Sequence, residues 1–344
     1  MLRLGVIGSG MISEQFIRAS HRVFKVIAVA SRREESARQL LNNTGMTDAR
    51  WVASMEELVT EPLDLIYIAS PNSLHAQHAL TAIKAGINVI VEKPAFWNPA
   101  QWEDVFSAAD KHGVLVFEAA RNVYEPGFAT VAQAVQEREV TSASFTFAQY
   151  SSRWDAVLTG DVPNIFSLDF GGGALVDLGV YTVYAAVAWF GEPTGVTYMP
   201  SLAPTGVDAH GTLVLSYPGF DVSIRIAKDF ASSLPSEIYC GRGRLIFDGV
   251  QDIRAVHSVQ GEETSRVFEV GTTDPQPLHQ LMRYEVEAIS SLISSHLAGG
   301  LSNGQRASYL RLTELSRVVN KVCTKARHDA GIFFTGESET AEIL

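Results

Sequence analysis

The chain contains very little cysteine. Only Cys240 and Cys323 occur among its 344 residues, far apart and in no CxxC pair. Zinc ribbons and thioredoxin-like redox centres need closely spaced cysteine pairs, so the sequence disfavours both. Two lone thiols fit a reducing compartment, and a chain of this length can bury a large core without disulfides or structural metal.

Positive charge is also scarce. The chain has 27 Lys and Arg against 38 Asp and Glu, which gives a formal net charge of −11. This excess of negative charge disfavours binding to nucleic acid, itself a polyanion, although a local basic patch can still hold a phosphate group. Long charge runs, internal repeats and low-complexity tracts are missing too.

Long apolar runs are equally rare. A membrane-spanning helix needs roughly 18 apolar residues, and the longest apolar region, Val180–Phe190, is about half as long. The N-terminus does not resemble a signal peptide, because its short apolar run leads directly into a turn at Gly8. We therefore expect a cytoplasmic protein with no membrane partner.

Strand and helix patterns alternate through the first 120 residues. Repeated β-α units with apolar strands predict an α/β fold, a doubly wound parallel sheet with helices on both faces. A helix is expected to begin after Ser54, with Glu57 completing a capping box. The strands are predicted at 2–7, 26–30, 50–53, 63–69, 87–91 and 114–118, and the other helices at 11–20, 34–42, 73–85 and 100–111.

The pattern changes after about residue 123. Following a helix at 125–137, period-two alternation predicts a C-terminal α+β domain with a large, mainly antiparallel open sheet. Two domains, 1–122 and 123–344, are expected from this change and from the chain length. The tail from Gly331 is expected to be loosely held. The strands are predicted at 142–150, 210–217, 222–230, 237–240, 244–247 and 266–270, and the closing helices at 278–295 and 303–325.

A glycine-rich turn, Gly8-Ser9-Gly10-Met11-Ile12-Ser13, joins the first predicted strand to the first helix. The first glycine permits the tight turn, and the second lets backbone approach a pyrophosphate at the positive end of the helix. Ser13 replaces the usual third Gly or Ala, but the strand-turn-helix context still predicts a Rossmann dinucleotide-binding domain. The alternative is a glycine turn without a ligand. The predicted cofactor contacts here are Gly8, Ser9, Gly10, Met11 and Ile12.

The end of the second predicted strand bears on the choice of cofactor. NAD-specific sites place Asp or Glu there, about 20 residues after the glycines, to bind the ribose hydroxyls. Here Ser31, Arg32 and Arg33 occupy that position. A hydroxyl and two guanidiniums suit the 2′-phosphate of NADP, which Arg can bind bidentately. We predict NADP(H) over NAD(H). The alternative is that both arginines are solvated residues at a helix start.

Two further segments carry residues suited to proton transfer. The fifth predicted strand runs into Glu92-Lys93-Pro94, at the sheet edge where open α/β folds bind ligands. In the segment 171–181, GGGALVDLGVY, a glycine turn is predicted to let backbone approach a ligand, and Asp177 and Tyr181 share one face of the next helix. An ammonium, a carboxylate and a phenol can together transfer protons in alcohol–carbonyl interconversion. Taken singly, Lys93 could be a surface residue and Tyr181 a packed aromatic.

Together these motifs resemble those of the Gfo/Idh/MocA oxidoreductase family. The matching pieces are GSGMIS at 8–13, ASPNSLH at 69–75, VEKP at 91–94 and GGGALVDLGVY at 171–181, in matching order from residue 1 to about 185. The resemblance implies that Lys93 contacts the reacting oxygen and that Asp177 is the aspartate of the family motif. It also implies further cofactor contacts from Ser70, Pro71, Asn72, His75, Glu92 and Lys93.

Tyr181 stands where the family usually has histidine. This departure resembles the branch of glucose-fructose oxidoreductase and dihydrodiol dehydrogenase, which mostly uses NADP. A phenol is a much weaker acid than an imidazolium, so a tyrosine here serves mainly as a proton donor unless its surroundings favour the phenolate. The hypothesis makes Tyr181 the acid in carbonyl reduction and the base in alcohol oxidation, with Lys93 stabilising the developing alkoxide and Asp177 orienting the set.

Three interpretations remain open from the sequence. The first is an NADP(H)-dependent oxidoreductase that interconverts a hydroxyl and a carbonyl on a small polyhydroxylated substrate, a sugar, polyol or cyclic diol. The second is a catalytically silent NADP-binding redox sensor or regulator, which the presence of Lys93, Asp177 and Tyr181 disfavours. The third is an NAD-dependent inositol-type dehydrogenase, which Tyr181 and the missing acid at Ser31 disfavour.

The remaining predictions concern substrate, metal and assembly. Arg121 and Asn122 follow the sixth predicted strand and are candidate substrate contacts. His75 and His78 are three residues apart, but no carboxylate or cysteine completes a metal site, so no metal is expected. Few helices are predicted to cover the antiparallel sheet, and an exposed apolar sheet face commonly marks an oligomer interface. We therefore expect a homodimer or homotetramer through that face, as the resemblance also implies.

Overall fold

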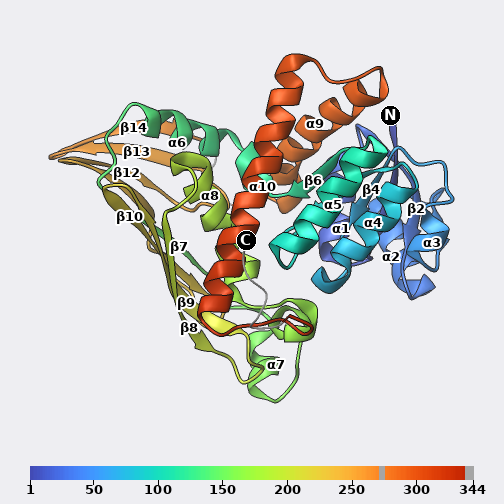
Figure 1. Cartoon of the computed structure of the whole chain (residues 1–344), viewed down its shortest axis with the longest axis horizontal. Coiled ribbons are helices and arrows are strands. Elements are labelled where there is room, and N and C mark those ends of the chain that lie inside the picture. The colour runs from blue at the N-terminus through green and yellow to red at the C-terminus, as the bar shows by residue number, and fades with distance from the viewer. Residues whose placement is uncertain (271–275, 338–344) are drawn as a thin grey trace. The chain divides into compact units, whose positions relative to one another are not determined.

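The structure, a computed structural model, describes residues 1–270 and 276–337. Contacts between residues divide it into two compact units. Figure 1 colours the chain by residue number. Unit 1 comprises 1–121 and 276–314, and unit 2 comprises the described residues between 122 and 275 and those from 315 onwards. The predicted division at 122 differs in one segment, because 276–314 groups with unit 1. The reason is that α9 (Leu278–Leu297) packs its apolar face against α1 (Met11–Ser20).

A six-stranded sheet of order β3-β2-β1-β4-β5-β6 forms the centre of unit 1. Every pairing in it is parallel, and the order reverses between β1 and β4, so the predicted doubly wound Rossmann sheet is confirmed. Residues of β4 and β5 are buried throughout, as expected for strands covered on both faces. The strands are β1 (Leu2–Ile7), β2 (Phe24–Ala30), β3 (Arg50–Val52), β4 (Leu65–Ile68), β5 (Asn88–Glu92) and β6 (Val116–Ala119).

Helix ends in unit 1 follow local sequence signals. Ser54 caps α3 by accepting a hydrogen bond from the Glu57 N–H, and the Glu57 carboxylate accepts one from the Ala53 N–H. The left-handed glycines Gly45 and Gly113 end α2 and α5. These helices connect the strands at the sheet: α2 (Glu34–Thr44), α3 (Met55–Leu58), α4 (His75–Lys84) and α5 (Pro99–His112).

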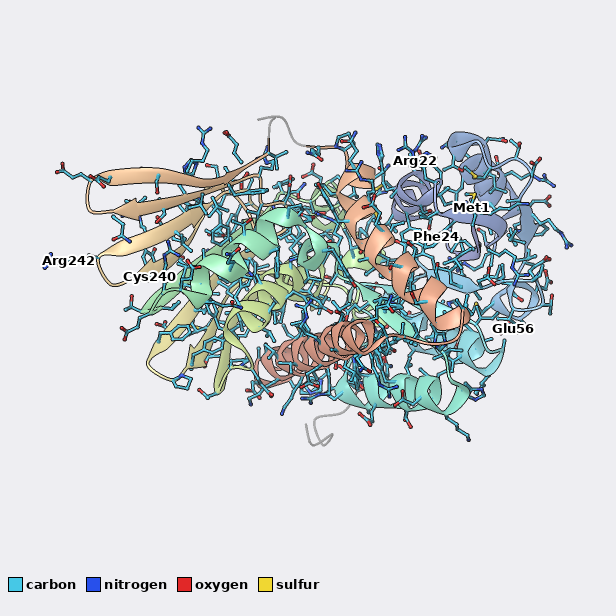
Figure 2. All side chains as sticks on the ribbon, turned by 90° about the horizontal axis from the view of Figure 1, so that it is seen from above. Met1, Arg22, Phe24, Glu56, Cys240 and Arg242 are labelled. Atoms are coloured by element: carbon cyan, nitrogen blue, oxygen red, sulfur yellow. The ribbon has the colours of Figure 1, made fainter. Side chains whose placement is uncertain are left out.

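Unit 2 contains an eight-stranded sheet of order β14-β13-β12-β11-β7-β10-β9-β8. Apart from the parallel pair β7–β10 it is antiparallel, which confirms the predicted mainly antiparallel sheet. Figure 2 labels Cys240 and Arg242 at the turn between β11 and β12. The strands are β7 (Ser142–Ala148), β8 (Gly195–Leu202), β9 (Asp208–Tyr217), β10 (Phe220–Ala227), β11 (Ser236–Cys240), β12 (Gly243–Phe247), β13 (Ala255–Gln260) and β14 (Glu263–Glu269).

Helices cover one face of this sheet. Figure 1 shows α6 (Pro126–Gln136) and α8 (Val180–Phe190) on the same side of the strands, and both contact them. On the other face the central strands present Ser144, Thr212, Ser223 and Arg225. The open face is therefore mainly small and polar, not the apolar face that the sequence analysis expected. The remaining helices are α7 (Trp154–Leu158) and α10 (Asn303–Asp329).

One helical segment, Leu168–Phe190, is long and apolar enough to cross a membrane by length and composition, with a mean hydropathy of 1.4. No such segment was predicted from the sequence, because Asp169 and Asp177 interrupt the apolar run. Within the structure 72% of its most apolar window is buried, as expected for the core helix of a globular unit.

The C-terminal tail is anchored as far as Glu337, so the expectation of a loosely held tail is wrong for the described part. Arg327 forms an ion pair with Glu337, and their side chains are only 1% and 5% exposed. Ile332 and Phe334 are buried, and the Arg327 guanidinium lies 3.7 Å from the centre of the Phe334 ring. The apolar residues that interrupt the polar tail therefore fix it to unit 2.

Candidate functional site

The two glycines of the first turn have different surroundings. Gly8 has φ +108°, and a Cβ there would lie 2.3 Å from the carbonyl oxygen of Ala69. Only glycine therefore fits where the turn crosses the end of β4. A Cβ on Gly10, by contrast, would meet no atom within 4 Å. Gly10 is the N-cap of α1 and provides no side-chain cap, so the helix N-terminus opens onto free space suited to an anion.

The residues after β2 form a polar rim beside this turn. The Ser9 and Ser31 hydroxyls are 3.0 Å apart, and the Trp51 indole donates to the Ser31 carbonyl over 2.9 Å. Arg32 and Arg33 are exposed, and neither has an ion-pair partner in the described part of the chain. No carboxylate stands at this strand end, so the group that would bind ribose hydroxyls in an NAD site is missing there.

His75 joins the loop after β4 to the loop after β5. Its Nε2 lies 2.9 Å from the Ser70 carbonyl oxygen and its Nδ1 lies 3.1 Å from that of Pro94. The side chain is 1% exposed, and burial lowers the pKa of His75 to about 4. His75 is therefore neutral near pH 7, and its single N–H donates to one of these two carbonyls while the ring packs against the other. Ser70 also bonds His78, and Pro71 and Asn72 continue the same loop.

Glu92 and Lys93 stand at the carboxyl end of β5. Glu92 is buried and accepts a hydrogen bond from the Tyr67 hydroxyl. Burial raises the pKa of Glu92, while the Tyr67 bond and the positive charge of Lys93 oppose that rise. Lys93 is half-buried, in the position where parallel sheets present ligand-binding groups.

In unit 2, Asp177 and Tyr181 lie in consecutive helical turns. Residues Leu175–Gly179 form a π-helical turn that continues directly into α8, a feature often found at functional sites. Tyr181 is half-buried, with its ring edge-on to Phe147 at 5.8 Å between centres. The structure therefore presents both predicted catalytic side chains of this unit on one continuous helical segment.

Lys228 is a partner of Asp177 that sequence reasoning missed. Its Nζ lies 2.7 Å from Asp177 Oδ2, and the lysine side chain is 2% exposed against 31% for Asp177. The same ammonium donates to the Ile165 carbonyl over 3.1 Å. The sequence does contain a signal for the burial of Lys228, namely the apolar residues Val222, Ile224 and Ile226 at every second position of β10, all of which are buried. Continuing that period places Lys228 on the core face.

The second glycine turn packs against the protein itself. A Cβ on Gly172 would lie 2.6 Å from the Ile165 carbonyl carbon, and one on Gly173, at φ +129°, would lie 2.1 Å from Asp208 Oδ1. Buried Asp208 also accepts from the Leu175 N–H over 2.6 Å and from the Tyr198 hydroxyl over 2.6 Å. These glycines therefore have a packing reason within the chain, in contrast to the ligand approach expected from their sequence.

Arg121 and Asn122 are both buried. The Asn122 amide donates to the carbonyls of Tyr181 (3.3 Å) and Val250 (3.1 Å). These bonds give Asn122 a role in holding the start of α8, and a substrate contact from it stays a prediction, as does one from Arg121. Among the described residues, no group of three or more His, Cys, Asp or Glu side chains could hold a metal ion.

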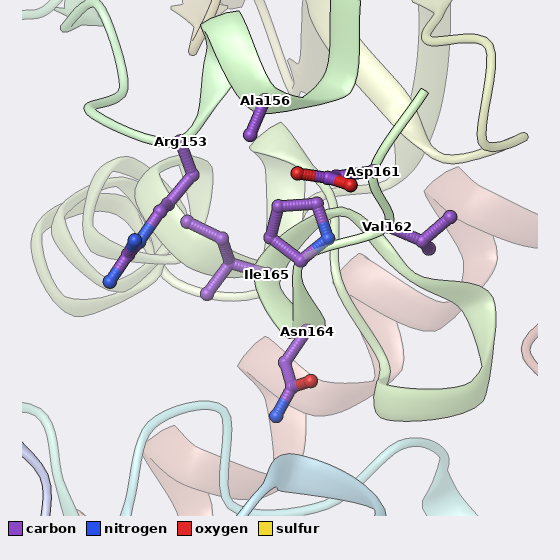
Figure 3. Close-up of a pocket in the computed structure, with 7 residues that line it drawn as sticks. Arg153, Ala156, Asp161, Val162, Asn164 and Ile165 are labelled. Carbon is purple, nitrogen blue, oxygen red and sulfur yellow. The ribbon is translucent and has the colours of Figure 1, made fainter. Parts of the chain in front are cut away.

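A pocket of about 610 Å³ opens in unit 2 beside the Ile165 segment. Figure 3 shows Arg153 and Asn164 extending to different sides of it, with Ile165 between them. Ile165 lines this pocket, and its carbonyl also accepts the Lys228 bond. The Lys228 ammonium therefore links the Ile165 backbone at this pocket to the Asp177 carboxylate. Its lining is Arg153, Ala156, Asp161, Val162, Pro163, Asn164 and Ile165.

Comparisons with known proteins agree with these features. The model of the GFO/IDH/MocA oxidoreductase family with an NAD-binding Rossmann fold matches residues 2–120, and the model of a GFO/IDH/MocA C-terminal domain matches residues 128–246. The chain is 33% identical to the uncharacterized oxidoreductase YgjR of Escherichia coli, over 98% of this chain and 99% of that protein. It is 30% identical to the scyllo-inositol 2-dehydrogenase (NADP(+)) IolU of Bacillus subtilis, with the same coverage.

More distant matches have the same extent. Identity is 26% to the trans-1,2-dihydrobenzene-1,2-diol dehydrogenase of Xenopus tropicalis, over 96% of this chain and 98% of that protein. Among solved structures, the 3-ketoreductase KijD10 of Actinomadura kijaniata, in complex with NADP and TDP-benzene, shares the fold with a TM-score of 0.79 and 23% identity. That match covers 97% of this chain and 99% of the other.

Proposed function

The chain belongs to the Gfo/Idh/MocA oxidoreductase family, and from this premise we propose that it is an NADP(H)-dependent dehydrogenase or reductase that interconverts a hydroxyl and a carbonyl on a small polyhydroxylated substrate. Oxidoreductase activity on hydroxyl groups follows from its relatives, which are dehydrogenases. The observation that carries the proposal for this chain is the presentation of Asp177 and Tyr181 on one helical segment, with Lys93 at the end of β5.

The cofactor would be held by residues of unit 1. Open space at Gly10 suits a pyrophosphate, and Met11, which is 68% exposed at the first turn of α1, is available for contact. Arg32 and Arg33 would bind the 2′-phosphate that distinguishes NADP from NAD. The nicotinamide supplies hydride transfer when the cofactor is bound. The full proposed set is Gly8, Ser9, Gly10, Met11, Ile12, Ser31, Arg32, Arg33, Ser70, Pro71, Asn72, His75, Glu92 and Lys93.

Three residues would handle the proton and the charge. In carbonyl reduction, the Tyr181 hydroxyl donates a proton to the carbonyl oxygen, and in alcohol oxidation its deprotonated form takes that proton back. The Lys93 ammonium stabilises negative charge that develops on the same oxygen. Asp177 orients the set as an acceptor of fixed position, because Lys228 holds one of its oxygens.

The substrate class is supported by the names of two relatives. One acts on scyllo-inositol and the other on trans-1,2-dihydrobenzene-1,2-diol, and both names describe a six-membered ring with neighbouring hydroxyls. We therefore place cyclic polyols and diols first among candidate substrates, followed by sugars.

A substrate panel tests the proposal. The protein is incubated with NADP⁺ or NAD⁺ and scyllo-inositol, trans-1,2-dihydrobenzene-1,2-diol or D-xylose, and the absorbance of the reduced cofactor is followed. The reverse reaction uses NADPH with ketoses and dicarbonyls. Turnover of at least one compound, faster with NADP(H), is expected. NADPH binding without turnover of any compound would support the silent redox sensor instead.

We also propose a cytoplasmic homodimer or homotetramer that assembles through the open face of the unit 2 sheet. The support is that the central side chains of this face, such as Ser144 and Thr212, are small enough for two sheets to approach closely. Light scattering at micromolar concentration should give the mass of two or four chains. A strictly monomeric mass would contradict this assembly.

A further inference from the structure

The buried ammonium of Lys228 makes two hydrogen bonds and one cation–π contact. Two acceptors lie within hydrogen-bond distance, Asp177 Oδ2 at 2.7 Å and the Ile165 carbonyl at 3.1 Å. The Phe166 ring centre lies 4.3 Å from Nζ, a cation–π distance. An ammonium has three donors and no acceptor, so two of its N–H groups are hydrogen-bonded and the aromatic ring borders the charge. Asp177 is the direct ion-pair partner of this ammonium, and the buried carboxylate of Asp208 also interacts with it electrostatically.

We propose that Lys228 is a positioning residue, which fixes the Asp177 carboxylate and ties the pocket-lining segment at Ile165 to the helix that carries Tyr181. This inference rests on the proposed function for its catalytic consequence, but the pairing itself can be tested without it. The Lys228 ammonium contacts Asp177, the Ile165 carbonyl and the Phe166 ring, and not the Tyr181 hydroxyl, so its effect on the reaction passes through Asp177.

The two partners differ in exposure, and the difference predicts unequal costs of removal. The Asp177 side chain is 31% exposed, so water can solvate it when Lys228 is lost. The Lys228 side chain is 2% exposed, so loss of Asp177 leaves a buried cation without its hydrogen-bonded ion-pair partner. Asp177→Asn should therefore destabilise the fold more than Lys228→Met does, although Asp177 is the residue assigned to the reaction.

A thermal double-mutant cycle tests this pairing. Asp177→Asn should lower Tm by roughly 5 °C or more, the effect of a buried charge without its ion-pair partner in a unit of this size. Adding Lys228→Met should raise Tm again, because it removes the orphaned cation. Lys325→Met is the matched control, since Lys325 forms an exposed pair with Asp329 at 2.8 Å. Its Tm should move by about 1 °C or less.

Amide hydrogen exchange reports on the Ile165 segment. The Gly173 N–H donates to the same Ile165 carbonyl over 3.1 Å. When Lys228→Met removes the charge-assisted bond to that carbonyl, exchange at peptides covering 161–175 should quicken by about tenfold. Lys325→Met should leave exchange there unchanged.

Steady-state kinetics separate the positioning role of Lys228 from its effect on the stability of the fold. The substrates are scyllo-inositol and NADP⁺. If scyllo-inositol is not oxidised, the panel compound with the highest kcat/KM replaces it. Lys228→Met should lower kcat about tenfold in the parent protein and have no further effect in the Asp177→Asn background. The inference is overturned if Asp177→Asn leaves Tm unchanged, if Lys228→Met lowers the Tm of Asp177→Asn further, or if its kinetic effect persists without Asp177. Absence of turnover with every compound would refute the proposed function, while Tm and exchange would still decide the pairing.

Discussion

The glycine turn at 8–10 in unit 1 and the one at 171–173 in unit 2 both stand directly before a helix. In the first, Gly8 fits against the carbonyl of Ala69, while Gly10 borders open space. In the second, Gly172 and Gly173 fit against Ile165 and Asp208 of the same chain. A glycine-rich turn can therefore leave room for a ligand or fit closely against the rest of the protein, and the atoms around each glycine distinguish the two cases.

Substituting one glycine from each turn should give the largest difference in stability between two variants. Gly173→Ala places a Cβ against Asp208 at φ +129°, so we expect a loss of about 3 kcal/mol or more in the free energy of unfolding. Gly10→Ala is the matched control for stability, because no atom lies near its Cβ. Urea unfolding measures both. Equal stabilities of the two variants would show that Gly173 is not packed as described.

A pH titration of the free energy of unfolding would test the burial of neutral His75 in unit 1. The pKa of His75 falls from 6.5 to about 4 on burial, so between these values the unfolded chain binds more protons at this residue than the folded chain does. Stability that is present above pH 6.5 is therefore lost as pH falls towards 4, by up to about 3 kcal/mol at this residue.

The comparison of parent and His75→Gln isolates this contribution, because other groups titrate in both proteins. The variant should be less stable at pH 7, and its stability should fall less steeply between pH 6.5 and 4. A steeper fall in the variant would mean that the folded state keeps His75 protonated between its two carbonyl neighbours.

The proposed catalytic roles of Tyr181 and Lys93 predict a selective loss of catalysis. Tyr181→Phe removes only the hydroxyl, and Lys93→Met removes the charge but keeps the stem. Each should lower turnover of the substrate found in the panel by roughly 10²-fold or more, with the NADPH dissociation constant nearly unchanged. The double variant should lose less turnover than the product of the two single losses, because both residues are proposed to act on the same step. Near-full activity of Tyr181→Phe would make Tyr181 a packing residue.

Cofactor choice gives the smallest expected effect and concerns unit 1 alone. Replacing Arg32 and Arg33 by Ala should weaken NADPH binding about tenfold or more and leave NADH binding nearly unchanged, because only NADPH carries the 2′-phosphate. Arg38→Ala is the control, since Arg38 is exposed and pairs with Glu34. Fluorescence titration of both cofactors measures the effect. If the parent binds NADH as tightly as NADPH, the two arginines do not select the cofactor.

The extent of sequence prediction differs between the units for physical reasons. Strands β1, β4 and β5 are buried on both faces, so each reads as an apolar run and was located to within two residues at most ends. Strand β8 was missed because it is an edge strand with Tyr198 as its one clearly buried side chain and with Pro200 inside it.

The site was predictable where it rests on local motifs and not where it depends on contacts distant in sequence. Asp177 and Tyr181 stand four apart in one segment, so their shared helix could be read directly. The Lys228–Asp177 pair joins residues 51 positions apart, and Asp208 meets Leu175 across 33. Helix α9 was assigned to the wrong unit for the same reason, because no pattern within it names α1 as its partner.

The proposed reaction is hydride transfer between NADP(H) and a substrate carbon, which can be followed by isotope transfer. NADPH deuterated at the transferring carbon of its nicotinamide is incubated with the protein and the carbonyl compound that the panel selects. The product alcohol is analysed by mass spectrometry. The account predicts one deuterium on the carbon of the former carbonyl, and a roughly 10²-fold slower appearance of it with Tyr181→Phe. Alcohol product without deuterium, or no reduction of any compound while NADPH binds normally, would contradict it.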